Sequence, residues 1–366
     1  MTNPFCASFV HARRRVVVIK QTEEVRVLAA FDKFKGTASA RDLARVVGHA
    51  CWDLGIDCDE VALADGGEGT LEALGGATRA DVVTGPLGDP VTAEWRLHRG
   101  TAVIEMARAS GLTLVGGPEH NDAVAASTTG TGELIELALE SGAKKIVVCL
   151  GGSATTDGGL GAVRAIHAPA RLRKVDFVVA CDVDTLFVDA ARVFAPQKGA
   201  TATQVRLLES RLQRLVQLYK ESHGVDVSNV RGSGAAGGLA GGLVALGARL
   251  VPGFDLVADE VDLHDRMREC DLVITGEGRL DVTSFEGKVV GGVAEMAREL
   301  GKPVVAVVGA VHDSVEDSPA AELLPATKHG PGVVALVDRH GADASLREPL
   351  RCVEETVREL LRARSD

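Results

Sequence analysis

The feature that most constrains this fold is a repeated unit, in which a short apolar run leads into a polar, glycine-rich loop and then into a helical pattern. Residues 27–31 lead into the loop 32–36, and residues 61–64 lead into the loop 65–70. The loop 151–159, GGSATTDGG, follows a third apolar run. Strands that alternate with helices in this way favour an α/β fold with a parallel sheet.

The rest of the chain extends this pattern. Ser39 stands where a helix N-cap is expected, and Gly55 stands just past the expected end of that helix. Residues 81–106 differ, because Gly-Pro and Gly-Asp-Pro turns divide them into short strands of an antiparallel meander. Further strands are expected at 146–150, 177–181, 272–275, 304–308 and 333–337, and further helices at 132–141, 202–222, 232–247 and 346–364.

Length and charge narrow the class of protein. A chain of 366 residues with 46% hydrophobic content is long enough for two domains. The net charge of -11 argues against a nucleic-acid partner, because an acidic surface repels phosphate backbones. No stretch has the roughly 18 apolar residues that a membrane span needs, so no membrane partner is expected.

The cysteines indicate a reducing compartment. They are odd in number and show no C-x-x-C spacing, which favours buried thiols in the cytoplasm over a zinc site or a disulfide framework. Residues 1–24 are interpreted as a flexible N-terminal tail, since their apolar run at 16–19 is too short for a secretory segment. The seven cysteines are Cys6, Cys51, Cys58, Cys149, Cys181, Cys270 and Cys352.

The loops at the expected strand ends share one chemistry. Ligands of α/β sheets bind at the carboxyl ends of the strands, where these loops fall. Glycine lets backbone N–H groups approach an anion, carboxylates can hold Mg²⁺ or accept a hydroxyl proton, and lysine can neutralise phosphate. Together these groups favour phosphoryl transfer. The loops are DKFKG (32–36), DGGEGT (65–70), GGSATTDGG (151–159), DVD (182–184), FAPQKGA (194–200), GSGAAGG (232–238) and GEGRLDVTSFEGK (276–288).

Each of these features also has a structural interpretation, which stays open at this stage. Asp281 fits the cap of a following helix, and Arg279 fits an ion pair with Glu277. Lys198 and Lys288 fit solvated surface charges. Only the number of such loops at one end of one sheet favours a shared site.

Named motifs exclude some enzyme classes and leave one open. The Gly-Lys step at 287–288 lacks the earlier glycine of a Walker A loop, since Val282 stands there. Thr155 stands where a G-x-S-x-G nucleophile elbow needs its last glycine. The segment 232–237 matches the G-x-G-x-x-G dinucleotide fingerprint, although a weakly patterned segment precedes it. A Rossmann-type NAD-dependent oxidoreductase is therefore an alternative enzyme class.

Taken in order, the loops resemble those of the type-1 glycerate kinase family from about residue 25 to the C-terminus. Any one segment is unspecific, but the ordered set is specific. The segments that carry the resemblance are FDKFKG (31–36), ADGGEGT (64–70), VTGPLG (83–88), IEMA (104–107), ASGL (109–112), GTGEL (130–134), GGSATTDGG (151–159), ACDV (180–183), PQKGA (196–200), GAAGG (234–238) and ITGEGRLD (274–281).

The resemblance implies a kinase that uses ATP and Mg²⁺ to phosphorylate a hydroxyl of glycerate, with 2-phosphoglycerate favoured over 3-phosphoglycerate as the product. It also implies two α/β domains, one with a flavodoxin-like parallel sheet wound with helices and one with a mixed sheet, and an active site in the cleft between them. The expected division is a discontinuous flavodoxin-like domain of 25–80 plus 265–366 and a second domain of 81–264.

The chain departs from the family pattern in three places. The stretch between Asp157 and Asp182 is shorter. Thr185 to Val188 stand where the family has Asn-Pro-Leu followed by Gly-Pro, and Thr283-Ser284 replace Gln-Thr after Asp281. These departures motivate a second alternative, a non-catalytic binder of small anions or nucleotides that derives from the kinase.

We expect the following roles under the kinase hypothesis. Lys35 or Arg279 would pair with the carboxylate of glycerate, and Lys198 or Lys288 would offset the charge of the γ-phosphate. Asp65 is the first choice for general base or metal ligand, because a strand end holds it rigidly.

The remaining expected site residues bind phosphate, substrate or metal. The Mg²⁺ ligands would come from Asp157, Asp182 and Asp281. The expected phosphate- and substrate-binding residues are Gly66, Gly67, Glu68, Gly151, Gly152, Ser153, Thr155, Gly234, Gly237, Gly238, Gly276, Glu277 and Lys288. The expected partners are glycerate and a nucleotide, and a homodimer stays open.

Overall fold

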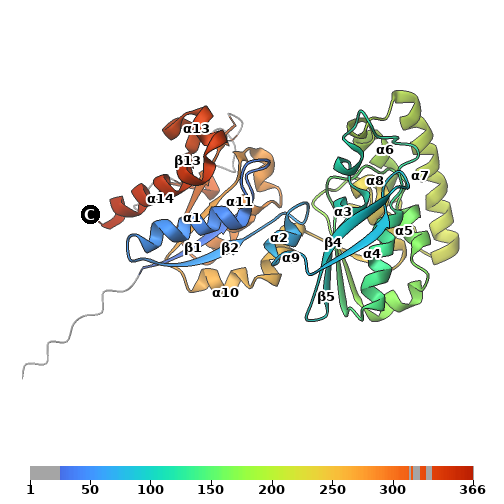
Figure 1. Ribbon diagram of the computed structural model, residues 1–366, viewed down its shortest axis with the longest axis horizontal. Coiled ribbons are helices and arrows are strands. Elements are labelled where there is room, and N and C mark those ends of the chain that lie inside the picture. The colour runs from blue at the N-terminus through green and yellow to red at the C-terminus, as the bar shows by residue number, and fades with distance from the viewer. Residues whose placement is uncertain (1–24, 313–314, 316–321, 327–331, 366) are drawn as a thin grey trace, which may run out of the picture.

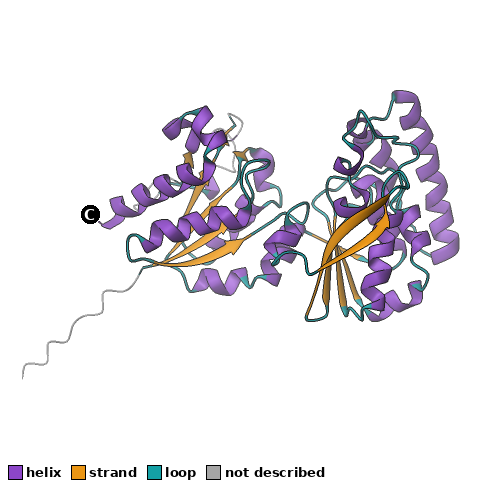
Figure 2. Cartoon of the chain, in the orientation of Figure 1, coloured by secondary structure: helices purple, strands orange, loops and turns teal. Residues whose placement is uncertain are grey.

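The computed structural model describes residues 25–312, 315, 322–326 and 332–365, so the expected tail of residues 1–24 lies outside the described residues. Two sheets lie apart in the molecule, each covered by its own helices (Figures 1 and 2). We call the part around the five-stranded sheet the first lobe and the part around the six-stranded sheet the second lobe. Two helices, α2 (Thr70–Ala73) and α9 (Gly253–Glu260), lie between the lobes (Figure 1).

The first lobe has a parallel sheet in the strand order 2-1-3-4-5, which is the flavodoxin-like order. The structure thus confirms the expected flavodoxin-like sheet. From one edge to the other, its strands are β2 (Asp57–Ala62), β1 (Arg26–Phe31), β9 (Leu272–Gly276), β11 (Val304–Val308) and β13 (Val333–Ala335). A separate short pair joins β10 (Arg279–Leu280) to β12 (Ala310–Val311).

Helices cover both faces of this first sheet. Successive side chains of a strand point to opposite faces, so Val27 and Ala29 of β1 pack with one helix layer, and Leu28 and Ala30 pack with the other. The first layer is α1 (Ala40–Trp52) and α14 (Pro349–Ser365), and the second is α10 (Leu263–Arg268) and α11 (Val289–Glu299). The lobe also carries η5 (Val282–Phe285), α12 (Leu336–His340) and α13 (Ala342–Arg347).

The second lobe has a mixed sheet, as expected. Its first three strands pair antiparallel, which confirms the predicted meander, and its last three continue in parallel. In sheet order the strands are β3 (Arg79–Thr84), β4 (Pro90–His98), β5 (Thr101–Glu105), β6 (Lys145–Cys149), β7 (Asp176–Ala180) and β8 (Arg249–Val251).

The helices of the second lobe enclose a core of their own beside the sheet. In α7, Leu208, Leu212 and Tyr219 are almost fully buried, which confirms the predicted apolar stripe. The helical elements are α3 (Ala107–Ser110), η1 (Thr113–Val115), α4 (Thr129–Glu140), α5 (Leu160–Ala165), η2 (Pro169–Lys174), η3 (Phe187–Asp189), α6 (Ala190–Phe194), η4 (Pro196–Lys198), α7 (Ala202–His223) and α8 (Ala235–Ala245).

Several predicted boundaries were wrong for physical reasons. The run 333–337 is a strand only to Ala335, because Leu336 begins α12. The expected closing helix 346–364 is two helices, and Pro349 starts the second at a position where its missing N–H is not needed. The strand expected at 61–64 is β2, which begins earlier at Asp57 and is polar because it lies at the edge of the sheet.

Two stretches of chain cross between the lobes, at 63–78 and at 252–262. The first contains α2 and the second contains α9. We keep the division into 25–80 plus 265–366 and 81–264 as a proposal, since both crossings lie next to its boundaries.

Candidate active site

A cavity of about 1030 Å³ is lined by residues of both lobes. Its walls include the segments that follow β1, β2, β6, β7, β9 and β11, so the carboxyl ends of parallel strands from both sheets meet there. This is where the topology of open α/β sheets places a ligand. Most of the glycine-rich loops that the sequence singled out therefore reach one hollow.

Many of the expected site residues line this cavity. They are Lys35, Asp65, Gly67, Glu68, Gly151, Gly152, Ser153, Asp182, Lys198, Glu277, Arg279 and Lys288. The other expected residues do not line it. These are Gly66, Thr155, Asp157, Gly234, Gly237, Gly238, Gly276 and Asp281.

Lys198 is the most deeply buried of the five cationic side chains that line the cavity. It is 3% exposed, and its Nζ donates to Ser153 Oγ and to the carbonyl of Thr155, both at 2.6 Å. Burial lowers its pKa to about 7, an effect that Asp157 opposes. The interpretation of Lys198 as a solvated surface charge is therefore wrong. One further N–H of the charged amine remains for an anion in the cavity.

Three carboxyl groups of the cavity have raised pKa values. Burial raises the pKa of Asp32 to about 6, and that of Asp182 to about 7. The charge of Asp65 adds to both shifts, so Asp65 lies within electrostatic range of the other two. Burial also raises the pKa of Glu277 to about 7, and Asp32 adds to that rise. The cavity thus holds a group of mutually repelling carboxylates, a pattern typical of functional sites.

The other cations stand at the more open parts of the cavity. Lys35 and Arg279 are exposed, and neither makes an ion pair with any residue that the structure describes. This includes the pairing of Arg279 with Glu277 that the sequence left open. Lys288 is partly buried and donates to Thr283 Oγ1 at 2.9 Å.

Asp157 lies away from the cavity and serves the second lobe. Its carboxylate accepts hydrogen bonds from four donors: the N–H and hydroxyl of Thr128 at 2.9 and 2.8 Å, and the N–H groups of Gly159 and Gly161 at 3.0 and 3.1 Å. It borders a separate hollow of about 480 Å³. A carboxylate with four donors ties α4 to α5, so we drop it from the metal ligands.

Asp281 also has a structural partner set. Its Oδ1 accepts from the N–H and the hydroxyl of Thr283 at 2.8 and 2.7 Å, and it caps η5. These bonds lower its pKa, the hydroxyl bond most of all. The alternative of Asp281 as a cap is therefore confirmed, and we drop it from the metal ligands.

The glycines of the segment 232–238 approach protein backbone. A Cβ on Gly237 would lie 2.0 Å from the carbonyl oxygen of Thr155, so only glycine allows this contact. Thr155 itself is fully buried. Gly276 is similarly enclosed, since a Cβ there would lie 2.0 Å from the carbonyl oxygen of Val307. We therefore remove the glycines of the segment 232–238, Thr155 and Gly276 from the phosphate-binding set. The neighbouring Ala235 and Ala236 do line the cavity.

The context of the dinucleotide fingerprint is also missing. A G-x-G-x-x-G loop joins a strand to a helix in the Rossmann fold. Here the element before the segment 232–237 is the helix α7, and α8 begins within the segment, at Ala235. The NAD-dependent alternative thus loses its structural support.

Sequence reasoning missed two residues that line the cavity and one that joins the loops around it. Asp32 and Lys33 stand in the first glycine-rich loop and line the cavity, so that loop was signal enough to include them. Asn121 had no signal, yet its side-chain amide donates to the carbonyls of Ala154 at 2.9 Å and Lys198 at 2.8 Å. It joins two loops that are far apart in the sequence, which only the fold reveals.

Two features are absent from the described residues. No helix in this part of the chain is long and apolar enough to cross a membrane. No group of three or more His, Cys, Asp and Glu side chains among the described residues is arranged to hold a metal ion by itself.

Comparisons with known proteins agree on one family. The chain matches the model of the glycerate kinase family over residues 27–170 and 167–362. It is 39% identical over 331 residues to the Glycerate 2-kinase of Escherichia coli (strain K12), covering 80% of this chain and 87% of that protein. It is 37% identical over 327 residues to the Glycerate kinase of Bacillus subtilis (strain 168), covering 78% and 85%.

The fold comparison agrees with these relatives. A crystal structure described as that of "putative glycerate kinase 2 from Salmonella typhimurium LT2" shares 32% identity, with a TM-score of 0.74 over 93% of this chain and 99% of that chain. The two segments of the family match overlap at 167–170, inside the shortened stretch between Asp157 and Asp182. The chain therefore belongs to the glycerate kinase family.

Proposed function

We propose that the chain is a type-1 glycerate kinase, which transfers the γ-phosphoryl group of ATP to a hydroxyl of glycerate and forms 2-phosphoglycerate in preference to 3-phosphoglycerate. The name of the Escherichia coli relative, Glycerate 2-kinase, supports the preferred product. Family membership over most of the chain supports the reaction class.

One observation carries the proposal, namely the charge arrangement of the cavity between the lobes. The cavity is lined by five cationic and five acidic side chains, although the whole chain has a net charge of -11. Both substrates are anions, so local cations lower the cost of bringing them together. The ten residues are Lys33, Lys35, Lys198, Lys288 and Arg279, and Asp32, Asp65, Asp182, Glu68 and Glu277.

The chain's own residues divide the chemical work. We propose that Asp65 accepts the proton of the attacking hydroxyl, and that Lys35 or Arg279 pairs with the glycerate carboxylate. The buried amine of Lys198, with Lys288 as the alternative, stabilises negative charge on the phosphoryl oxygens. Gly151, Gly152 and Ser153 form the wall beside which the phosphates would lie.

The donor set of the cavity fits Mg²⁺. This ion keeps several waters and needs only one or two carboxylates together with substrate phosphates, so a closed protein cage is not required. The mutual repulsion of Asp32, Asp65 and Asp182 would be relieved by a divalent cation. When bound, the ion would offset the charge on the phosphate oxygens. We propose Asp182, with Asp65 as the alternative, as its carboxylate ligand.

A coupled assay with ATP, Mg²⁺ and D-glycerate tests the reaction. Formation of phosphoglycerate supports the kinase, and NMR of the product identifies the phosphorylated hydroxyl. Nucleotide binding without turnover would instead support the non-catalytic binder that the shortened stretch 157–182 motivates. Within an active enzyme, Asp65→Asn should lower kcat by about 10²–10⁴-fold. A loss of only a few-fold would contradict its role as the base.

We also propose that the enzyme acts in the cytoplasm. The six cysteines that the structure describes are free thiols, and such thiols persist in a reducing compartment. A homodimer remains a proposal, which light scattering of the purified chain would test.

A further inference from the structure

The loop 65–70 belongs to the first lobe by sequence but packs on the second lobe. It follows β2, a strand of the first sheet. A Cβ on Gly66 would lie 2.5 Å from the Cα atom of Gly253 and 2.8 Å from the Cβ atom of Ala180, which ends β7. A Cβ on Gly151, just after β6, would lie 3.2 Å from the Cα atom of Gly67. The loop thus rests on strand ends of the other lobe.

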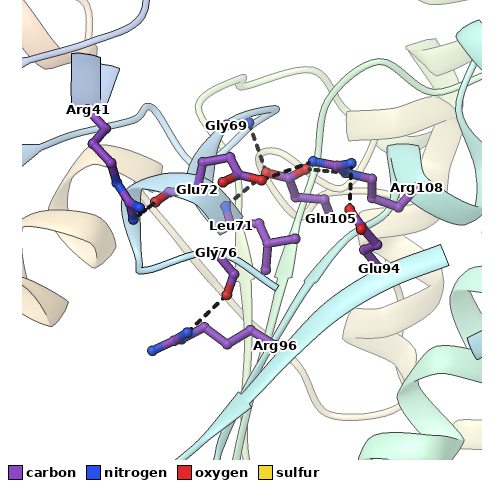
Figure 3. Close-up of polar contacts among 9 residues, drawn as sticks. All are labelled: Arg41, Gly69, Leu71, Glu72, Gly76, Glu94, Arg96, Glu105 and Arg108. Carbon is purple, nitrogen blue, oxygen red and sulfur yellow. Dashed lines mark hydrogen bonds and ion pairs between the residues drawn. The ribbon is translucent and has the colours of Figure 1, made fainter. Parts of the chain in front are cut away.

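The loop ends in α2, a short helix without a cap of its own. Its N-cap residue is Gly69, which has no side chain to accept the free backbone N–H groups of the first turn. Glu105 of the second lobe accepts them instead. Its Oε1 lies 2.8 Å from the nitrogen of Gly69 and 2.9 Å from that of Leu71 (Figure 3). Glu105 is the last residue of β5, so the cap comes from the other sheet.

The side chain of Glu105 is only 3% exposed, and a buried carboxylate is unfavourable unless hydrogen bonds or cations compensate its charge. Its Oε2 accepts from Arg108 Nε at 3.2 Å. The same guanidinium lies 3.2 Å from Glu94 and 3.6 Å from Glu72, at the partly exposed edge of the cluster (Figure 3). Arg108 therefore pairs with three carboxylates. The backbone N–H groups of Gly69 and Leu71, in contrast, donate to Glu105 alone.

The same loop carries side chains that face the cavity. Asp65 and Glu68 both line it. A Cβ on Gly152 would lie 2.4 Å from Glu68 Oε1, so the carboxylate of Glu68 rests against the phosphate-side wall. Any displacement of the loop would move both carboxylates relative to that wall.

We propose that Glu105 is a positioning residue for the phosphoryl transfer, which holds the loop 65–70 of one lobe on the sheet of the other and so places Asp65 and Glu68 at the cavity. This inference rests on the proposed function. Glu105 touches neither substrate in this arrangement, because it lies behind the loop and does not line the cavity. It acts through the backbone of Gly69 and Leu71.

The test compares Glu105→Gln with Glu105→Met. The two side chains have similar size, but only glutamine keeps an oxygen that can accept the two N–H groups. Glu105→Met should lower kcat by about 10²-fold at nearly unchanged KM, because a displacement of about 1 Å at a reacting group costs that much. Glu105→Gln should stay within about tenfold of the parent, since a neutral acceptor makes a weaker bond than a carboxylate.

Glu133 offers a matched control. Its carboxylate also accepts from a backbone N–H and a hydroxyl, both of Thr84, at 2.6 and 2.7 Å. These bonds join α4 to β3 within the second lobe and do not touch the loop 65–70. Glu133→Met should therefore lower thermal stability as Glu105→Met does, yet leave kcat within about twofold.

A second readout does not depend on activity. Hydrogen exchange of the Gly69 and Leu71 amides should become at least about tenfold faster in Glu105→Met and stay unchanged in Glu133→Met. Should Glu105→Met fail to fold, Glu105→Asp takes its place, since its shorter side chain keeps the charge but withdraws the acceptor.

The outcomes separate the two proposals. A wild-type enzyme that forms no phosphoglycerate would refute the proposed function and with it the catalytic part of this inference, and the exchange rates would then decide whether Glu105 holds the loop 65–70 on the second lobe. Unchanged exchange and a kcat within twofold in the Glu105 variants, at a stability loss equal to that of Glu133→Met, would overturn the inference. Faster exchange at Gly69 and Leu71, with the expected fall in kcat, would support it.

Discussion

The loop 151–159 has two halves with different surroundings. Gly151, Gly152 and Ser153 line the cavity, and the lysine amine of Lys198 contacts Ser153 there. The residues from 155 to 159 lie away from the cavity, inside the second lobe. There the carboxylate of Asp157 accepts four hydrogen bonds. One glycine-rich motif therefore contributes a ligand-facing wall and a structural anchor.

The two halves differ in the contacts that a side chain would make if it replaced a glycine. On the cavity side, a Cβ on Gly152 would meet the flexible end of Glu68. On the buried side, the loop meets rigid backbone, as in the contact between Thr155 and Gly237. A side chain added at Gly152 could be accommodated by a shift of Glu68, which would disturb the site. A side chain added where backbone packs against backbone could not be accommodated. Substitutions on the two sides should therefore alter activity and stability separately.

The largest expected effect is at Lys198. Lys198→Met should lower kcat/KM by about 10³-fold, because a buried positive charge beside the transferring phosphoryl group is lost. Methionine removes the cost of burying the amine but leaves Ser153 Oγ and the carbonyl of Thr155 without this donor, so the free energy of unfolding should change by no more than about 2 kcal/mol. Lys288→Met, which alters a partly exposed lysine, is the matched control. Steady-state kinetics and urea unfolding measure both, and a larger loss in the control would transfer the role to Lys288.

Next in size is Asp157, on the buried half. Asp157→Asn should lower the free energy of unfolding by about 3 kcal/mol, because an amide nitrogen would face donors that now reach a carboxylate oxygen. The KM for ATP and the dependence on Mg²⁺ should not change. Asp182→Asn should show the reverse, a change in Mg²⁺ dependence at nearly unchanged stability. Altered Mg²⁺ dependence in Asp157→Asn would restore Asp157 as a metal ligand.

A smaller effect is expected at Gly152, on the cavity half. Its φ of +62° and the contact with Glu68 penalise a side chain, so Gly152→Ala should lower kcat/KM about tenfold and stability by about 1–2 kcal/mol. Kinetics and thermal unfolding of the purified variant test this. Full activity with the same loss of stability would show that Gly152 supports the fold but not the reaction.

The smallest expected effect is a pH dependence of stability. The pKa of Lys198 is lowered to about 7 in the folded state, so above pH 7 the unfolded chain binds more protons at this group. Stability should therefore rise relative to Lys198→Met by about 1 kcal/mol between pH 7 and 8. Urea unfolding at both pH values measures the difference, and parallel curves for the two proteins would show that the amine is not desolvated.

Much of the architecture could be predicted from local patterns. Apolar runs marked the strands, and Ser39 was correctly taken as an N-cap, since its side chain accepts from the N–H of Asp42. The boundaries that failed were decided by neighbours. Leu336 joins a helix because its side chain completes the core under α1 and α14, which no local pattern indicates.

The site was predictable in part for the same reason. Loops that follow parallel strands meet at one edge, so Asp65, Ser153, Asp182 and Glu277 could be grouped in advance. Sequence could not separate them from Asp157, because a carboxylate in a glycine-rich loop looks the same whether it faces a cavity or a helix end. No role could be assigned to Asn121 or Glu105 from the sequence, because their partners lie far away in the chain.

The sequence by itself determined the alternation of strands and helices, the loops at the strand ends and the family resemblance, because these depend on neighbouring residues and on their order. Only the tertiary structure decided which glycines approach a cavity and which approach backbone, and which charges are buried. Those properties depend on contacts between segments far apart in the chain, such as the carboxylate of Glu105 on the loop 65–70. Burial and hydrogen bonding set the chemistry of each group, and both exist only once distant segments have packed together.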